Sequence, residues 1–270
     1  MSDKKINELL KLTANQVREG KYNKAILALG SCEAHGEHLA EGTDTLVSYM
    51  LSCKVAEEVE NLLVLPPVTV GYSRHYERFP FTLSLSYNTL ISVIYDILES
   101  TVKNGIDRIF IMNGHDGNIA PIEVASRSLK EKYPNVKIAT LAAWWVTAGE
   151  ILPRGTFEVM DGQGHAGEGE SSIAYYLYPQ WCEPELAEAV VPDNLPEHIE
   201  IKWDFSEITD KGLTGDATKA TPEKGEKIAK ALTELVVKTL RDLDEKNWSY
   251  NTTNMNWKSQ GERRSKEDVN

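Results

Sequence analysis

Short apolar runs alternate with helical stretches along the first half of the chain, and this alternation restricts the fold more than any other feature. Four runs have the β-branched, apolar character of buried strands: AILALGSC (25–32), LLVLPPVTV (62–70), RIFIMNG (108–114) and VKIATLAAWW (136–145). Three intervening stretches carry apolar residues at helical spacing: 43–60, 88–104 and 118–132. Buried strands separated by helices predict a mainly parallel sheet between two helical layers, a three-layer α/β/α fold.

Two further helices are predicted later in the chain, near residues 168–178 and across 221–243. Thr221 is a suitable N-cap for the second of these, and Pro222 a suitable first helical residue. At the N-terminus, MSDKKINELLKLTANQV has lysines but no apolar segment of the kind found in a secretory signal. We expect this stretch to form an amphipathic helix.

No internal repeat and no linker rich in Gly, Ser or Pro divides the chain. We therefore predict a single domain over residues 1–245. Residues 246–270 are polar and lack periodicity, so we expect a C-terminal tail. Its two tryptophans, Trp248 and Trp257, suggest that the tail packs on another surface, such as a neighbouring subunit.

Charge and hydropathy exclude several classes of protein. The net charge of −12 argues against a nucleic-acid surface, because neutralising phosphates needs clustered Lys and Arg. No apolar run approaches the roughly 20 residues of a membrane span. The three cysteines form no C-x-x-C pair, which fits reduced thiols better than a disulfide framework. We expect a cytoplasmic protein that acts on a small molecule.

Polar side chains gather in three clusters that follow predicted strands or precede a helix. The first cluster follows the strand at 25–32, and the second follows the strand residues 108–112. In open α/β sheets, ligands bind beyond the carboxyl ends of the strands. The clusters contain four of the six histidines. Their polar residues are Glu33, His35, Glu37, His38, Glu41 and Asp44; Asn113, His115, Asp116 and Asn118; and Asp161, His165, Glu168 and Glu170.

Imidazole and carboxylate groups together suit zinc, manganese or iron. Alternate residues of an extended loop point the same way, so Glu33 and His35 can converge on one ion. Asp44, a short loop later, can complete or bridge the site. His115 is expected to add a ligand from the neighbouring strand end.

Less specific interpretations remain for other members of the clusters. Glu37 and Glu41 fit ordinary solvated carboxylates, and all three clusters together could be no more than polar loops. Asp116 could be a ligand, a loop cap or a group that orients a ligand.

Aromatic and basic residues outside the clusters are candidates for substrate contacts. Arg74, His75 and Tyr76 could line a substrate entrance. In the pair Trp144-Trp145 one ring, most simply that of Trp145, could cover the site while the other fills the core.

The strings GSCEAHGEHLAEGTDT, NGHDGN and GHAGEGESS resemble the three signature segments of the creatininase family of metal-dependent hydrolases. The resemblance runs from about residue 20 to about 240 and includes GDATKATPEKG at 215–225. It implies a creatininase-like α/β/α fold and a homo-oligomer, commonly a hexamer built as a trimer of dimers. It also implies one or two divalent ions, with ligands at Glu33, His35, Asp44 and His115.

The resemblance assigns further roles and is incomplete at one position. His165 would be an acid or a stabiliser of the transition state, and Glu170 or Glu168 would carry the proton to the leaving group. The family has a glutamate two residues after the histidine of the second cluster, where this chain has Gly117. Glu170, rather than Asp116, is the favoured substitute ligand.

Three functions follow as alternatives. We rank first the hydrolysis of a small cyclic or formyl amide by a metal-activated water. Creatinine itself is not expected, because the tryptophan found before the third-cluster histidine in creatininase is replaced by Asp161-Gly-Gln-Gly. The second alternative is a C–C bond hydrolase that opens a cyclic diketo-polyol such as 3-dehydro-scyllo-inosose. The third is a metal-binding protein without turnover.

Overall fold

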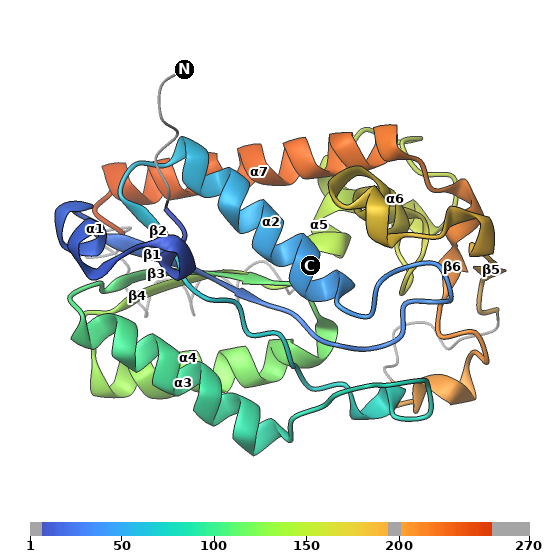
Figure 1. Cartoon of the computed structure of the whole chain (residues 1–270), viewed down its shortest axis with the longest axis horizontal. Coiled ribbons are helices and arrows are strands. Elements are labelled where there is room, and N and C mark those ends of the chain that lie inside the picture. Colours follow the sequence, from blue (N-terminus) through green and yellow to red (C-terminus); the bar gives the residue numbers. More distant parts are fainter. Residues whose placement is uncertain (1–6, 194–200, 250–270) are drawn as a thin grey trace, which may run out of the picture.

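Four parallel strands form the central sheet, in the spatial order β2, β1, β3, β4 (Figure 1). The computed structural model describes residues 7–193 and 201–249. The strands are β1 (Lys24–Leu29), β2 (Leu62–Val64), β3 (Arg108–Asn113) and β4 (Lys137–Leu141). All four coincide with predicted runs but end before them. In β2 the reason is visible in the sequence, since Pro66 and Pro67 cannot donate to a neighbouring strand.

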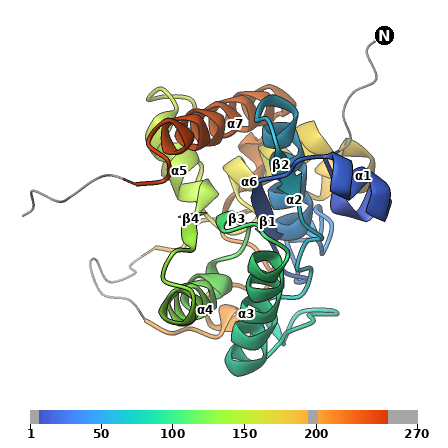
Figure 2. The ribbon, with the colours of Figure 1, turned by 90° about the vertical axis from the view of Figure 1, so that its left-hand side faces the viewer.

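Helices cover both faces of the sheet, which confirms the three-layer α/β/α prediction. Figure 2 shows α2, α5, α6 and α7 on one side of the sheet, with α3 and α4 on the other. The helices are α1 (Ala14–Glu19), α2 (Thr43–Glu58), α3 (Tyr87–Lys103), α4 (Ile119–Lys132), α5 (Trp144–Ile151), α6 (Glu168–Leu177) and α7 (Pro222–Glu245). Two short strands, β5 (Ala189–Val190) and β6 (Gly215–Asp216), pair antiparallel beside this core.

Alternate side chains of the strands pack into two separate hydrophobic cores, one on each face of the sheet. Ile26 and Phe110 pack towards α2, α6 and α7, whereas Leu27 and Ile109 pack towards α3 and α4. Every residue of β1 is buried, as a strand covered on both faces requires. Each fully buried Leu or Ile contributes about 1.5–3 kcal/mol relative to an exposed one.

Helix α7 begins as predicted and packs tightly on α6. The Thr221 hydroxyl accepts from the Lys224 backbone N–H, and Pro222 occupies the first turn. One turn later, a Cβ at Gly225 would lie 2.0 Å from the Ser172 carbonyl oxygen. The glycine therefore allows the two helices to approach closely, which holds the start of α6 against the rest of the fold.

Two local predictions were wrong. The N-terminal segment is not one amphipathic helix: among its described residues there is a 3-10 turn (Leu9–Lys11), and then α1 begins after Thr13. The backbone becomes extended at Leu12, which ends the turn, and the Thr13 hydroxyl then caps the new helix. The pair Trp144-Trp145 does not end a strand but begins α5, because Trp144 packs into the α7-side core.

The end of the described chain tests the predicted tail only in part. Trp248 is buried, and its indole N–H donates to the Asp244 carboxylate at 2.8 Å. Residues 250–270, with Trp257, lie outside the described residues, so the subunit contact stays a prediction. Within the described ranges, no helix has the length and apolar character needed to cross a membrane.

Candidate metal centre

The carboxyl ends of β1 and β3 bring the first two polar clusters together. Glu33 and His35 lie in the loop after β1, Asp44 lies in the first turn of α2, and His115 follows β3. All four side chains are at most 4% exposed. Burying four ionisable groups at one point costs free energy unless they pair with one another or bind a common ion. This cluster is therefore the strongest candidate for a functional site in the described chain.

The four side chains are within contact distance of one another. His35 Nε2 lies 2.9 Å from Asp44 Oδ1. His115 Nδ1 lies 3.1 Å from Asp44 Oδ2 and 3.3 Å from Glu33 Oε1. Asp44 therefore contacts both histidines, one through each carboxylate oxygen.

Backbone carbonyls orient both imidazole rings. His35 Nδ1 lies 3.0 Å from the carbonyl oxygen of Glu33, and His115 Nε2 lies 2.8 Å from that of Tyr72. A carbonyl only accepts, so these nitrogens carry the N–H. The opposite nitrogens then direct lone pairs towards the carboxylates in the neutral rings. Only a proton or a cation between them makes such an arrangement favourable.

Two carboxylate oxygens in the cluster have no hydrogen bond from any described residue. They are Glu33 Oε1 and Asp44 Oδ2, the two oxygens that face His115 Nδ1. Buried polar atoms are nearly always satisfied, so each exception needs an explanation. These three atoms all lie within 4.8 Å of one another, as do ligand atoms of Glu33, His35 and His165. A divalent ion between such atoms would satisfy them.

The pKa values report the same preference for a positive charge. Burial opposes ionisation of Asp44 and Glu33, but the neighbouring imidazoles outweigh it and lower the pKa of both carboxyls. Burial likewise opposes a charge on His35, yet Asp44 raises its pKa to about 10. A field that favours protons at this point favours a metal cation for the same electrostatic reason.

Gly117 lies where the family resemblance calls for a glutamate. A Cβ at this position would lie 2.1 Å from the Tyr72 carbonyl oxygen and 2.6 Å from His115 Nε2. The backbone here therefore excludes any side chain, including the expected carboxylate. Neither of the proposed substitutes, Glu170 and Asp116, belongs to the two ligand groups that the described residues form.

A cavity of about 250 Å³, here called the strand-end cavity, opens beside the cluster. Asp44 and His115 form part of its wall, so an ion at the cluster would face this space. The other residues that matter for its chemistry are Tyr76, Trp145, Gln163, His165, Glu170 and Phe205. The cavity lies beyond the carboxyl ends of the strands, the usual ligand position in such sheets.

His165 is held as a neutral acceptor. Its Nε2 lies 2.6 Å from the Ala34 carbonyl oxygen, so this nitrogen donates, and Nδ1 carries the lone pair. Burial and the nearby charge of His35 lower the pKa of His165 to about 3. This arrangement disfavours the acid role predicted for His165 and favours a role as hydrogen-bond acceptor.

Glu168 and Glu170 differ although both start α6 and both are buried. Glu170 lines the strand-end cavity, and burial raises the pKa of its carboxyl to about 7. Glu168 accepts from the backbone N–H groups of Glu158 and Val159, and from Lys224 at 2.6 Å. These bonds tie the α6 start to α7, away from the cavity, and disfavour the proton-transfer role predicted for Glu168.

The predicted substrate contacts separate into two sets. Tyr76 and Trp145 line the strand-end cavity, which matches the prediction that one ring of the tryptophan pair covers the site while Trp144 fills the core. His75 lies behind this wall, with its ring stacked 5.9 Å from that of His115. Arg74 is exposed and pairs loosely with Glu77, so it lies outside the cavity lining.

Some residues of the site were not predicted. Phe205 packs against the rings of both Tyr76 and His165, with centroid distances of 4.4 and 5.1 Å. It comes from a segment far along the chain with no motif of its own, so no sequence signal was available. Ser31 and Ser73 are fully buried behind the ligands, yet each reads as an ordinary loop serine.

His38, the remaining histidine of the first cluster, lies outside the ligand set. Its Nε2 donates to Ser171 Oγ at 2.7 Å, and that hydroxyl donates to the Ala166 carbonyl at 2.9 Å. Burial and then the charge of His35 lower the pKa of His38 to about 4. The neutral imidazole therefore joins the first loop to the start of α6.

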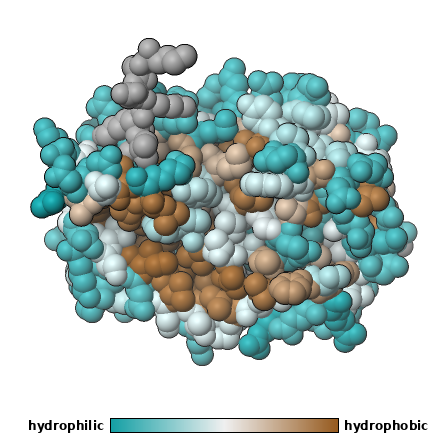
Figure 3. Space-filling model, viewed as in Figure 1, coloured by the Kyte–Doolittle hydropathy of each residue, from teal (hydrophilic) through white to brown (hydrophobic). Residues whose placement is uncertain are grey.

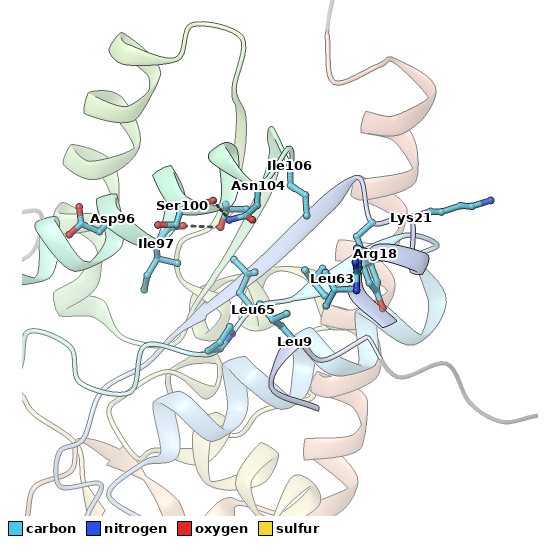
Figure 4. A pocket seen from close by; sticks show the side chains of 14 residues that line it. Leu9, Arg18, Lys21, Leu63, Leu65, Asp96, Ile97, Ser100, Asn104 and Ile106 are labelled. Carbon is cyan, nitrogen blue, oxygen red and sulfur yellow. Dashed lines mark hydrogen bonds between the residues drawn. The ribbon is translucent and has the colours of Figure 1, made fainter. Parts of the chain in front are cut away.

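A larger cavity lies elsewhere in the described chain. It measures about 580 Å³ and is here called the α1–α3 groove; its lining includes Leu9, Arg18, Leu65, Ile97 and Asn104. Figure 3 shows apolar residues gathered on this side of the molecule, and in Figure 4 Lys21 points away from them. The groove contains no histidine and only one carboxylate, so its residues offer no metal site.

Comparisons with known proteins agree with the resemblance seen in the motifs. The family model described as "Creatininase: Creatinine amidohydrolase" matches residues 10–240. The chain is 27% identical to the creatinine amidohydrolase of Pseudomonas putida, over 80% of this chain and 88% of that protein. It is 28% identical to a mycofactocin precursor peptide peptidase of Mycolicibacterium smegmatis, over 75% and 78%. It is 24% identical to the 3-dehydro-scyllo-inosose hydrolase of Thermotoga maritima, over 87% and 83%.

Solved structures give the same result for the fold. One described as "Creatininase Mn" matches with a TM-score of 0.76 and 25% identity, over 88% of this chain and 98% of that chain. A mutant creatininase described as "Zn-Zn type" matches with a TM-score of 0.75 and 25% identity, over the same shares. The names of these two structures support a divalent metal in the family.

Proposed function

The chain belongs to the creatininase family of hydrolases, and from that premise we propose that it hydrolyses a small cyclic or formyl amide with the help of a divalent metal ion. One observation carries the proposal: the unpartnered oxygens of Glu33 and Asp44 face the His115 lone pair beside the strand-end cavity. Such a set is open on the cavity side, which distinguishes it from a closed structural zinc site.

The residues present fit one ion well. Glu33, Asp44 and His115 would hold it, with His35 on the far oxygen of Asp44 available to a second ion. Zinc, manganese and iron all suit this mixture of imidazole and carboxylate ligands. When bound, such an ion lowers the pKa of a coordinated water and polarises a carbonyl oxygen.

The chain's own residues would position the substrate and move the proton. Glu170, whose pKa of about 7 lets it both accept and donate near neutral pH, would carry the proton to the leaving nitrogen. Burial raises the pKa of Tyr76 well above its usual value, so its hydroxyl stays protonated and can donate to a substrate oxygen. His165 would accept from a substrate N–H. Trp145 and Phe205 would limit the access of bulk water.

Cavity size and the relatives favour an amide of low molecular weight. A volume of about 250 Å³ lies below the range of roughly 300–1,000 Å³ that is usual for drug-sized ligands. Two of the three relatives have names of enzymes that act on creatinine or on a peptide. Creatinine itself is not proposed, because Asp161-Gly-Gln-Gly precedes His165 where the resemblance to creatininase calls for a tryptophan.

A cyclic diketo-polyol is the second candidate substrate. Asp116, Gln163 and Thr214 line the same cavity and offer hydrogen bonds to hydroxyl groups. The Thermotoga maritima relative has the name of a 3-dehydro-scyllo-inosose hydrolase. Cleavage would then occur at a C–C bond next to a carbonyl, with Glu170 supplying the proton to carbon. A metal-binding role without turnover loses support, because all three relatives are named as hydrolases or peptidases.

Metal depletion and a substrate panel test the proposal. The protein would be stripped with a chelator, reloaded with Zn²⁺, Mn²⁺ or Fe²⁺, and assayed on cyclic ureides, N-formyl amides, dipeptides and 3-dehydro-scyllo-inosose. We expect metal-dependent turnover of an amide. Exclusive turnover of the diketo-polyol would favour the second candidate, and a protein that binds no divalent ion would refute the metal proposal.

Assembly and location stay predictions. We propose the homo-oligomer that the resemblance implies, a hexamer arranged as a trimer of dimers, and light scattering after size exclusion would measure its mass. The predicted cytoplasmic location would be tested by fractionation of the source cells.

A further inference from the structure

We propose that Ser31 and Ser73 form a buried hydroxyl relay that joins two metal ligands and sets the affinity of the site for its ion. The inference rests on the proposed metal function and deepens it, because it concerns residues that touch the ligands rather than the ion. Ser31 precedes Glu33 in the loop after β1, whereas Ser73 lies in a separate loop before α3. Both serines are completely buried.

The relay is a continuous set of contacts between the two ligands. Ser31 Oγ lies 2.8 Å from Glu33 Oε2, and it also contacts Ser73 Oγ. Ser73 Oγ lies 3.3 Å from His115 Nε2. The chain of contacts thus runs from His115 through two hydroxyls to Glu33, and neither serine lines the strand-end cavity.

The two ends of the relay determine the direction of every hydrogen bond. His115 Nε2 carries its N–H, because it also contacts the Tyr72 carbonyl oxygen, so Ser73 Oγ accepts from it. An ionised carboxylate only accepts, so Ser31 must donate to Glu33. Each hydroxyl has one hydrogen, which leaves Ser73 to donate to Ser31. A single arrangement of protons satisfies all four groups.

This arrangement affects both ligands at once. The bond from Ser31 engages Glu33 Oε2 and leaves Oε1, the unpartnered oxygen, facing the metal position. The contact of Ser73 with His115 Nε2 supports the tautomer in which Nδ1 has the free lone pair. Groups that orient metal ligands in this way typically change metal affinity or activity by 10–100-fold when they are removed.

Ser31 and Ser73 are therefore positioning residues, and the test measures metal binding by the whole chain. Ser31→Ala, Ser73→Ala and the double variant would be titrated with Zn²⁺ against a chromophoric chelator, and the unfolding of each metal-free protein would be followed by heating. Ser52→Ala is the matched control: Ser52 is equally buried, but among the described residues its hydroxyl bonds only the Ser48 carbonyl within α2.

We expect each single variant to bind Zn²⁺ about 10–100-fold more weakly, while Ser52→Ala binds as wild type does. Because both serines belong to one relay, the Zn²⁺ affinity of the double variant should be only slightly below that of the weaker-binding single variant. The two fold-losses in affinity should not multiply. Ser31→Thr and Ser73→Thr keep the hydroxyl and should bind more tightly than the corresponding alanine variants.

Each failure has a different meaning. Wild-type protein that binds no Zn²⁺, Mn²⁺ or Fe²⁺ overturns the proposed function. Wild-type protein that binds the ion, with alanine variants that bind equally well and only melt earlier, overturns the relay and leaves the metal function intact. Losses that multiply in the double variant also contradict a relay, because they indicate two independent contacts.

Discussion

Of the two cavities, the larger α1–α3 groove has the less reactive lining, and the smaller strand-end cavity has the more reactive one. The groove is the larger, at about 580 Å³ against about 250 Å³, and its lining is mostly apolar. The smaller cavity borders a buried cluster with unpartnered carboxylate oxygens and imidazole lone pairs. The volume of a cavity shows only where side chains leave space unfilled. Buried polar atoms without partners mark a candidate binding site, and here they lie beside the smaller cavity.

The sharpest test of this contrast removes one ligand charge. Glu33→Gln deletes the negative charge and replaces one oxygen that faces His115. We expect metal binding to weaken by more than about 100-fold, beyond the effect of losing an orienting group, and turnover to fall below detection. Metal content after dialysis and a turnover assay measure both effects. Glu37→Gln is the control, because Glu37 is an exposed glutamate of the same loop; equal losses in both variants would remove the special status of Glu33.

The two glutamates of α6 allow a second test. Glu170→Gln removes the group proposed to carry the proton, so we expect kcat to fall by about 10²–10⁴-fold with little change in stability. Glu168→Gln weakens the bonds from two backbone N–H groups and from Lys224, which keeps Glu158 as a partner, and we expect a destabilisation of about 1–3 kcal/mol. Steady-state kinetics and urea unfolding of both variants separate the two roles. The reverse pattern would mean that Glu168, not Glu170, is the residue that acts in the reaction.

His38 supplies a test through pH. Its pKa is near 6.5 in the unfolded chain and about 4 in the fold, so the unfolded state takes up the proton first as pH falls. The stability that neutral His38 contributes is full above pH 6.5, and roughly 3 kcal/mol of it is lost by pH 4 at 1.36 kcal/mol per pKa unit. The titratable groups near its ring are His35 and Tyr175.

Urea unfolding between pH 7 and 4, with a chelator present, measures this effect. We expect His38→Gln to have a shallower loss of stability than wild type over that range, since it has no proton to take up. Ser52→Ala, which changes no titrating group, should stay parallel to wild type. Identical slopes for all three proteins would show that His38 does not titrate as inferred.

The smallest effect is expected in the α1–α3 groove. Arg18 is exposed at its rim, so Arg18→Ala should change stability by no more than about 0.5 kcal/mol and leave turnover and metal content as in wild type. The same assays apply. A clear loss of turnover would show that the groove is coupled to the strand-end cavity, and the contrast between the two regions would fail.

Most of the fold could be predicted because parallel strands covered on both faces need continuous apolar sequence. The run at 108–114 became β3 almost residue for residue. Local amphipathicity was a poorer guide, since it could not show that Thr13 would cap a new helix. Helix α5 was missed because Trp144 and Trp145 have the aromatic character of strand residues, and only packing under α7 decides otherwise.

The ligand cluster could be expected because spacing and strand ends bring Glu33 and His115 together. The neighbours of each side chain could not be predicted, since they come from distant parts of the chain. Lys224 neutralises Glu168 from 56 residues away, and Phe205 covers His165 from another loop. A motif thus indicates the kind of chemistry, while the assignment of each carboxylate depends on contacts that only the folded chain has.

Gly117 has a consequence for the order in which this site could be re-engineered. A glutamate introduced there alone would meet the Tyr72 carbonyl before reaching any ion, so the variant should misfold or displace His115. In a directed-evolution library that selects for a second tightly bound ion, Gly117→Glu should therefore emerge only after a change that moves the backbone near Tyr72. The order of the two changes is fixed, because the loop must shift before the new carboxylate can bring any advantage.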